Sequence, residues 1–144
     1  MQTLLFPVWM DRFRDLAWLA MRLFLGAFLV WGVWDNIVSA ERMAEFATFL
    51  ARLGCPLPSI AAPVSVWAQF LIGVLLIPGL LTRWAGVLLA FNFVAAVALL
   101  APSGAGIRDL YPPAVLIFIG LWLATAGAGR LSIDALFEPA RPRP

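Results

Sequence analysis

Histidine and lysine are absent from the sequence, and cysteine occurs once, at Cys55. Without histidine the chain lacks the usual axial ligand of haem and the commonest ligand of zinc, copper and non-haem iron, so we expect no metal centre built by this chain alone. A single cysteine excludes an intramolecular disulfide and a CxxC redox pair. We interpret Cys55 as a small residue in a Gly-Cys-Pro turn, with pairing to another chain or a reactive thiol as alternatives.

Charged residues are also scarce. Only 12% of the 144 residues are charged and 63% are hydrophobic, whereas soluble domains are roughly half apolar and about one quarter charged. The basic residues are all arginines and are dispersed along the chain, which leaves no basic patch for nucleic acid. No phosphate-binding loop or nucleophile elbow occurs, which disfavours an autonomous nucleotide enzyme or hydrolase. The sequence therefore predicts an integral membrane protein.

Long apolar segments predict the transmembrane helices, because about 20 apolar residues are needed to cross a bilayer. We expect these spans at about residues 16–38, 61–81, 84–101 and 111–128. The second and third form a hairpin with its connection at residues 81–84. Pro63 suits the first turn of the second span, and Pro78 with Gly79 should bend or end its last turn. The prediction is an all-α, four-helix transmembrane bundle in a single domain over residues 1–144.

The region between the first two spans is the most polar internal part of the chain. Within it, Phe46, Phe49, Leu50 and Leu53 follow the i, i+3, i+4, i+7 spacing of one helical face. We expect an amphipathic helix on the membrane surface that ends at Gly54. It serves either as an ordinary connecting helix or as a docking surface for a partner.

The arginine distribution predicts the orientation. One side of the membrane collects Arg12, Arg14, Arg83, Arg130, Arg141 and Arg143, and the other side collects Arg42, Arg52 and Arg108. Since positive residues favour the cytoplasmic side, we expect both termini in the cytoplasm of a cell (inner) membrane protein.

Polar side chains gather in the half of the bundle away from the termini. They are Asp35 and Asn36 at the end of the first span, Gln69 and Asn92 inside the second and third, and Arg108, Asp109 and Tyr111 before the fourth. Polar groups at membrane depth are costly unless they are paired, so this patch is a candidate ligand site. We assign no catalytic residue and no metal ligand within it.

Alternative roles remain open for these residues. Gln69 and Asn92 each donate and accept hydrogen bonds, so they either join helices or hold a quinone carbonyl. Asp35 and Arg108 could equally form a plain ion pair. Arg22 lies inside the first span, roughly 20 Å along the helix from Asp35. We interpret it as a structural intramembrane charge that needs a partner elsewhere or reaches the interface by snorkelling.

Several segments in order resemble the DoxX family of membrane proteins. The run from Arg22 to Gly26, followed by Trp31 to Asn36, resembles the family's opening helix. Similar counterparts are the helix and Gly-x-Pro turn at residues 49–58, the hairpin at 73–85, and the closing GxGRxSxD-like element at 127–134. The resemblance implies a four-helix membrane protein associated with redox systems, in some members quinone-linked sulfur oxidation or oxidative-stress complexes.

From this resemblance we expect a membrane subunit associated with a redox oxidoreductase system. The alternative is a noncatalytic anchor or assembly protein that recruits a partner. Quinone is the candidate ligand, and no covalently bound cofactor is expected. The expected surroundings are the lipid bilayer, with a redox protein or a second copy of the chain as candidate partners. The family commonly has Glu where this chain has Gln69, which favours binding or structure over proton-coupled chemistry at that position.

Overall fold

The computed structural model describes residues 13–137. Its elements are α2 (Arg14–Val38), α3 (Ala40–Arg52), α4 (Pro58–Leu76), α5 (Thr82–Leu100), the 3-10 helix η2 (Ala101–Ser103), α6 (Ile107–Ala126) and α7 (Asp134–Phe137). No strand occurs in this range. Helices α2, α4, α5 continued by η2, and α6 are long and apolar enough to cross a membrane. The predicted all-α, four-helix membrane bundle is confirmed.

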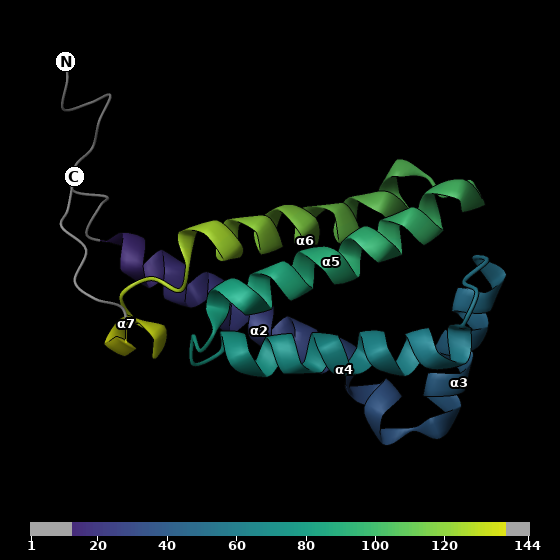
Figure 1. The fold of residues 1–144 in the computed structure, drawn as a ribbon, viewed down its shortest axis with the longest axis horizontal. Helices are drawn as coiled ribbons and strands as arrows, with labels where there is room; N and C mark the ends of the chain where they lie inside the picture. The colour runs from purple at the N-terminus through teal and green to yellow at the C-terminus, as the bar shows by residue number, and fades with distance from the viewer. Residues whose placement is uncertain (1–12, 138–144) are drawn as a thin grey trace, which may run out of the picture.

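The four long helices form two pairs. Helix α2 packs chiefly on α4, and α5 packs chiefly on α6, while α4 and α5 contact each other much less. Figure 1 shows both pairs close together at the α4–α5 turn and diverging toward the end that carries α3. We call these the turn end and the α3 end. The bundle is therefore closed at one end and splayed at the other.

Glycines set the spacing within each pair. A Cβ atom on Gly73 would lie 2.7 Å from the carbonyl oxygen of Gly26, and one on Gly86 would lie 2.6 Å from the carbonyl oxygen of Gly120. Such distances are shorter than van der Waals contact, so the backbones approach closely only because side chains are missing there. One crossing joins α2 to α4 and the other joins α5 to α6.

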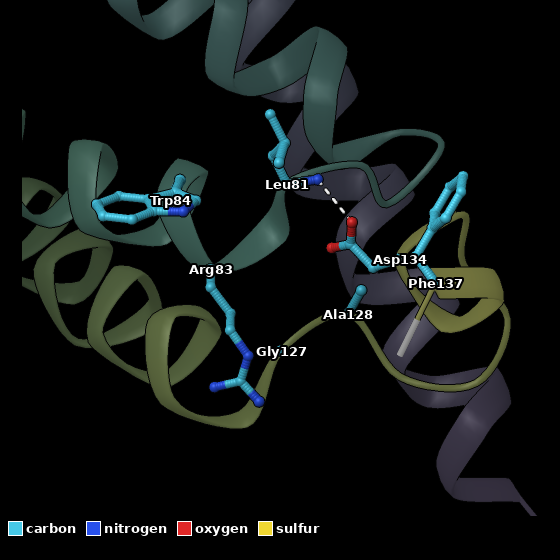
Figure 2. Close-up of a pocket in the computed structure, with 7 residues that line it drawn as sticks. All are labelled: Leu81, Arg83, Trp84, Gly127, Ala128, Asp134 and Phe137. Atoms are coloured by element: carbon cyan, nitrogen blue, oxygen red, sulfur yellow. Dashed lines mark hydrogen bonds between the residues drawn. The ribbon is translucent and has the colours of Figure 1, made fainter. Parts of the chain in front are cut away.

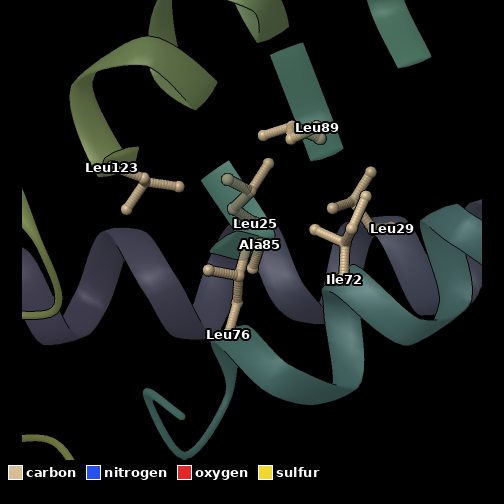
Figure 3. Close-up of a cluster of buried hydrophobic side chains, with 7 residues drawn as sticks. All are labelled: Leu25, Leu29, Ile72, Leu76, Ala85, Leu89 and Leu123. Carbon is tan, nitrogen blue, oxygen red and sulfur yellow. The ribbon is translucent and has the colours of Figure 1, made fainter. Parts of the chain in front are cut away.

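Apolar packing joins the two pairs near the turn end. Figure 3 shows the buried cluster, to which all four long helices contribute: Leu25, Leu29, Ile72, Leu76, Ala85, Leu89 and Leu123. The members from α4 lie in its last turns and those from α5 in its first turns, next to the connection between them. This cluster holds α2–α4 against α5–α6 at the turn end.

The boundaries of α4 and α5 differ from the predicted spans. Helix α4 begins at Pro58, so Pro63 lies inside the helix instead of in its first turn. It ends at Leu76, because Pro78 follows and Gly79 adopts a φ of 71°. The expected connection at residues 81–84 is also wrong, since Thr82 is already the first residue of α5.

Helix α6 begins earlier than expected, at Ile107 instead of Tyr111. The reason is a local cap: Asp109 Oδ2 accepts a hydrogen bond from the Gly106 N–H at 3.2 Å. A carboxylate in the first turn also interacts favourably with the positive end of the helix dipole.

The predicted amphipathic helix is present as α3. Ser39 caps its start, with Oγ accepting a hydrogen bond from the Arg42 N–H at 3.3 Å. Gly54, with a φ of 81°, follows its end. The Cys55 N–H then donates to the Leu50 carbonyl oxygen at 3.0 Å, so Cys55 does lie in a turn that closes the helix.

The closing segment, residues 127–137, folds back onto the α4–α5 turn. The N–H groups of Ile133 and Asp134 donate to the carbonyl oxygens of Pro78 and Gly79 at 3.1 and 2.9 Å. The Asp134 carboxylate accepts from the N–H groups of Leu81 and Thr82 at 2.7 and 2.8 Å, and Figure 2 shows the first of these bonds. Asp134 thereby caps the start of α5 from a distant part of the chain.

Arg22 holds the same segment from the other side. Its side chain is buried, with 1% exposure. It donates to the carbonyl oxygens of Ala128 at 2.8 Å and Leu131 at 2.6 Å. The intramembrane charge therefore has its partners in the backbone of the closing segment.

Candidate ligand-binding site

A cavity of about 410 Å³ lies at the α3 end, where the helix pairs diverge. This volume falls within the range of roughly 300–1,000 Å³ typical of small-molecule sites. Residues from α3, α4, α5 and α6 line it: Phe46, Phe49, Leu50, Leu53, Ala61, Val64, Ser65, Gln69, Phe91, Asn92, Phe93, Ala95, Ala96, Leu99, Leu100, Asp109 and Pro113. The walls are mostly apolar, with a few polar side chains among them.

Helix α3 supplies one wall of the cavity. The apolar stripe of Phe46, Phe49, Leu50 and Leu53 lines the space between the pairs. The apolar face of α3 therefore lines the same cavity as the polar residues Ser65, Gln69 and Asn92.

The polar centre of the cavity is a short hydrogen-bonded chain across α4 and α5. Gln69 Nε2 donates to Ser65 Oγ at 3.2 Å, and Ser65 Oγ donates to Asn92 Oδ1 at 2.9 Å. All three side chains are half-buried. Gln69 and Asn92 are thus brought together as predicted, but Ser65 joins them instead of a direct bond.

The hydrogen-bonded side chains of Gln69, Ser65 and Asn92 leave some of their hydrogen-bonding groups available for a ligand. Within residues 13–137, Asn92 Nδ2 donates no hydrogen bond and Gln69 Oε1 accepts none. An amide carries two N–H donors and a carbonyl acceptor. The cavity can therefore offer N–H groups to an oxygen atom of a bound molecule.

Asp109 lines the cavity from the first turn of α6. It is exposed, and its Oδ2 is already engaged with the Gly106 N–H. Among the residues that line this cavity it is the only ionisable one.

The other predicted site residues lie elsewhere. Asp35 and Asn36 form the corner between α2 and α3, where Asp35 Oδ1 accepts from the Asn36 N–H at 3.0 Å and Asn36 Nδ2 donates to the Arg42 carbonyl oxygen at 3.1 Å. Arg108 and Tyr111 are exposed near the start of α6 and do not line the cavity. No ion pair joins Asp35 to Arg108 in the described part of the chain.

Sequence reasoning missed Ser65. The available signal was its position four residues before Gln69, which places both side chains on one face of α4. A serine in an apolar helix more often bonds its own backbone, so only the position of Asn92 on the neighbouring helix reveals the link.

A smaller hollow of about 220 Å³ lies at the turn end (Figure 2). Its polar side chains are used by the fold, because Asp134 caps α5 and Arg83 donates to the carbonyl oxygens of Ala124 and Thr125 at 3.1 and 2.6 Å. Over residues 13–137, no cluster of three or more His, Cys, Asp or Glu residues could hold a metal ion. The cavity at the α3 end is therefore the candidate site.

Comparison with known proteins gives a family match. The model of the DoxX family matches residues 17–102. The matched range begins in the first turn of α2 and extends past the end of α5, so it includes Ser65, Gln69 and Asn92, whereas α6 and the closing segment lie beyond it. No curated protein and no solved structure matches the chain significantly.

Proposed function

Since the match covers more than half of its length, the chain belongs to the DoxX family, and we propose that it is a membrane subunit of a redox system that binds a quinone in the cavity at the α3 end. The resemblance to DoxX proteins of quinone-linked systems supplies the ligand class. The multi-pass architecture supports access to a lipid-soluble molecule.

The observation that carries this proposal is the polar chain inside an apolar cavity. A quinone has a flat apolar ring and carbonyl oxygens that accept hydrogen bonds. Asn92 Nδ2 and the second N–H of Gln69 Nε2 suit these oxygens, while Phe91, Phe93 and the stripe of α3 suit the ring. The residues present therefore fit a quinone by size, polarity and hydrogen-bonding type.

The role that the site supports is binding. Gln69 carries no titratable proton, and the one ionisable lining residue, Asp109, is exposed at the start of α6. Electron transfer then belongs to a partner in the same membrane. The proposed subunit holds the quinone where that partner meets it.

Binding of a short-chain benzoquinone to the purified protein in nanodiscs tests the proposal. We expect Asn92→Leu and Gln69→Leu each to weaken binding about five- to tenfold, because a net hydrogen bond contributes roughly 1–1.5 kcal/mol. The matched control is Asn36→Leu, which removes an amide side chain of the same type that does not line the cavity. We expect it to bind like the wild type.

Absence of quinone binding by the wild type would refute this function. Equal affinities for all four proteins would also refute it, because the ligand would then lie away from the polar chain. Weaker binding by Asn92→Leu and Gln69→Leu alone would support it.

A second candidate function is a noncatalytic anchor that recruits a partner through α3. The observation that favours it is a shallow depression on α3 lined by Glu41, Ala44, Glu45, Thr48, Phe49 and Arg52. Its charged side chains are exposed, and an Arg42–Glu45 ion pair of 2.9 Å lies beside it.

Affinity capture from gently solubilised membranes tests this role and should recover a stoichiometric partner. The variant Arg52→Glu should lose the partner, while the control Arg130→Glu, at the turn end, should retain it. Recovery of a lone homo-oligomer would contradict this role.

For the orientation we propose that the turn end faces the cytoplasm of the cell membrane. The sequence-based count of six arginines on the side of the termini against three on the other supports this orientation, although Arg12, Arg141 and Arg143 of that count lie outside the described residues. Cys55, partly exposed beyond α3, should then react with a membrane-impermeant thiol reagent in intact cells. A cysteine introduced by Arg130→Cys in a Cys55→Ser background should react only after permeabilisation. The reverse labelling pattern would invert the topology.

A further inference from the structure

We propose that the cavity at the α3 end opens sideways into the bilayer, and that its ligand is a quinone whose long hydrocarbon tail lies in this opening. The inference rests on the proposed function and names the ligand class of the same site. It assigns the opening to apolar residues of three helices, which we call the lateral opening: Phe49 on α3, Val64 on α4, and Phe91 and Ala95 on α5.

The residues of the lateral opening combine two properties. Each lines the cavity, and each is also exposed on the outside of the bundle. The exposed fraction is 63% for Val64 and 72% for Phe91. Other exposed apolar residues of the spans, such as Val74 and Phe118, do not line the cavity. The cavity therefore reaches the outer surface of the bundle at the lateral opening.

Helix geometry places the two sides of the opening next to each other. Val64 and Phe91 each come one residue before a member of the polar chain, because Ser65 bonds Asn92 across α4 and α5. Successive residues of a helix are about 100° apart around its axis. Since α4 and α5 run in opposite directions, the same one-residue step turns both side chains toward the same flank of the α4–α5 contact.

The depth of the opening indicates that it faces lipid tails. Phe91 lies in the middle of α5, which is long and apolar enough to cross a membrane. The bond of 2.9 Å between Ser65 and Asn92 places Val64 at a similar depth. The exposed polar residue of the cavity lining, Asp109, lies instead at the start of α6. The lateral opening is therefore apolar and faces the hydrocarbon of the bilayer.

This position of the opening determines the ligand class. A cavity of about 410 Å³ is near the lower end of the usual range for ligand sites, so it holds a ring system but not a long hydrocarbon chain as well. Lipid tails are as apolar as the side chains of the opening. A tail that leaves the cavity there stays in an apolar environment, while the ring reaches the polar chain beside Val64 and Phe91.

The experiment compares two benzoquinones that share one ring and differ only in carrying a methyl or a decyl group. Affinities are measured with the full chain in nanodiscs and expressed as mole fractions in the bilayer, which removes the difference in partitioning. We expect the wild type to bind both within about threefold, because the decyl tail exchanges one apolar environment for another.

Substitution at the opening should separate the two ligands. Val64→Trp fills the opening, so we expect it to weaken binding of the decyl compound at least about tenfold, as overpacking commonly does. The methyl compound should change by less than about threefold, because it does not occupy the opening. Val74→Trp is the matched control, since Val74 is exposed on the same helix and does not line the cavity. It should bind both ligands like the wild type.

A second measurement uses the wild type alone and so does not depend on the folding of a variant. A decyl quinone with a diazirine on the first carbons of its tail is illuminated with the protein in nanodiscs. We expect it to modify the segments around Val64 and Phe91, and excess unlabelled decyl compound should suppress this modification.

Each outcome has a separate meaning. Binding of the methyl compound at least tenfold more tightly than the decyl compound by the wild type, or no tail label around Val64 and Phe91, overturns the lateral opening and leaves quinone binding standing. An equal effect of Val64→Trp on both ligands, or the same effect from Val74→Trp, overturns the placement of the tail in the opening. Absence of binding of either ligand overturns the proposed function and the opening together.

Discussion

Replacing Arg22 with methionine perturbs the most deeply buried charge of the described chain. The guanidinium is 1% exposed and donates to the carbonyl oxygens of Ala128 and Leu131. Hydrogen bonds from a charged donor contribute about 1.5–3 kcal/mol each, so their loss removes roughly 3–6 kcal/mol. Methionine also relieves part of the desolvation penalty of a buried charge, including that of Arg22 Nε, which has no partner among the described residues. We expect a net loss of about 2–4 kcal/mol in the free energy of unfolding.

The assay is SDS-induced unfolding in mixed micelles, followed by tryptophan fluorescence. Trp18 on α2 and Trp122 on α6 are good reporters, because their rings pack edge to face with their centroids 5.3 Å apart. The control is Arg130→Met. It removes an exposed arginine whose Nη1 lies 3.8 Å from Asp15 Oδ2 in an ion pair. Such a pair contributes about 0.5 kcal/mol or less. Equal stability of the two variants would refute the role assigned to Arg22.

Other substitutions test the packing and the cap. In the same unfolding assay, Gly73→Ala should destabilise the bundle by about 1–3 kcal/mol, because its new Cβ would collide with the Gly26 carbonyl oxygen. The control is Gly32→Ala, which should be neutral or slightly stabilising because nothing lies within 4 Å of its new Cβ. Asp134→Ala should cost about 1 kcal/mol by uncapping α5, and hydrogen exchange at the Thr82 amide should accelerate. Unchanged exchange there would contradict the cap.

The helices could be predicted well because their signals are local. Apolar runs long enough to cross a bilayer predicted the four long helices, and the helical spacing of apolar residues from Phe46 to Leu53 predicted α3. The ends were harder to place. Pro63 is compatible with a helix start and with a helix interior, and the structure uses the second. Likewise Asp109 reads equally as a loop residue or as a helix cap, and it is a cap.

The candidate site depended on contacts between distant residues. Topology alone brought Gln69 and Asn92 to the same half of the bundle, and the structure places them on one cavity. The same argument grouped Asp35 with Arg108, but the two helix pairs diverge at that end and no ion pair joins these residues in the described part of the chain. Sequence reasoning cannot show that divergence, because it arises from the glycine crossings within each pair and from the core near the turn end.

The closing segment shows the same limit. Arg22 was recognised as a charge that needs a partner, but its partners are backbone carbonyl oxygens more than 100 positions away. Backbone groups have no sequence signature. The cap that Asp134 provides for α5 is equally invisible, because helix caps are normally sought beside the helix start.

Photolabelling tests the central claim, that the cavity at the α3 end binds a quinone. A photoreactive quinone is illuminated with the protein in nanodiscs, and the labelled peptides are mapped by mass spectrometry. We expect labelling within residues 65–69 and 91–100, suppressed by excess unlabelled quinone. Labelling confined to the lipid-facing surface of α2 around Phe24 and Trp31, or labelling that unlabelled quinone does not suppress, would contradict the claim.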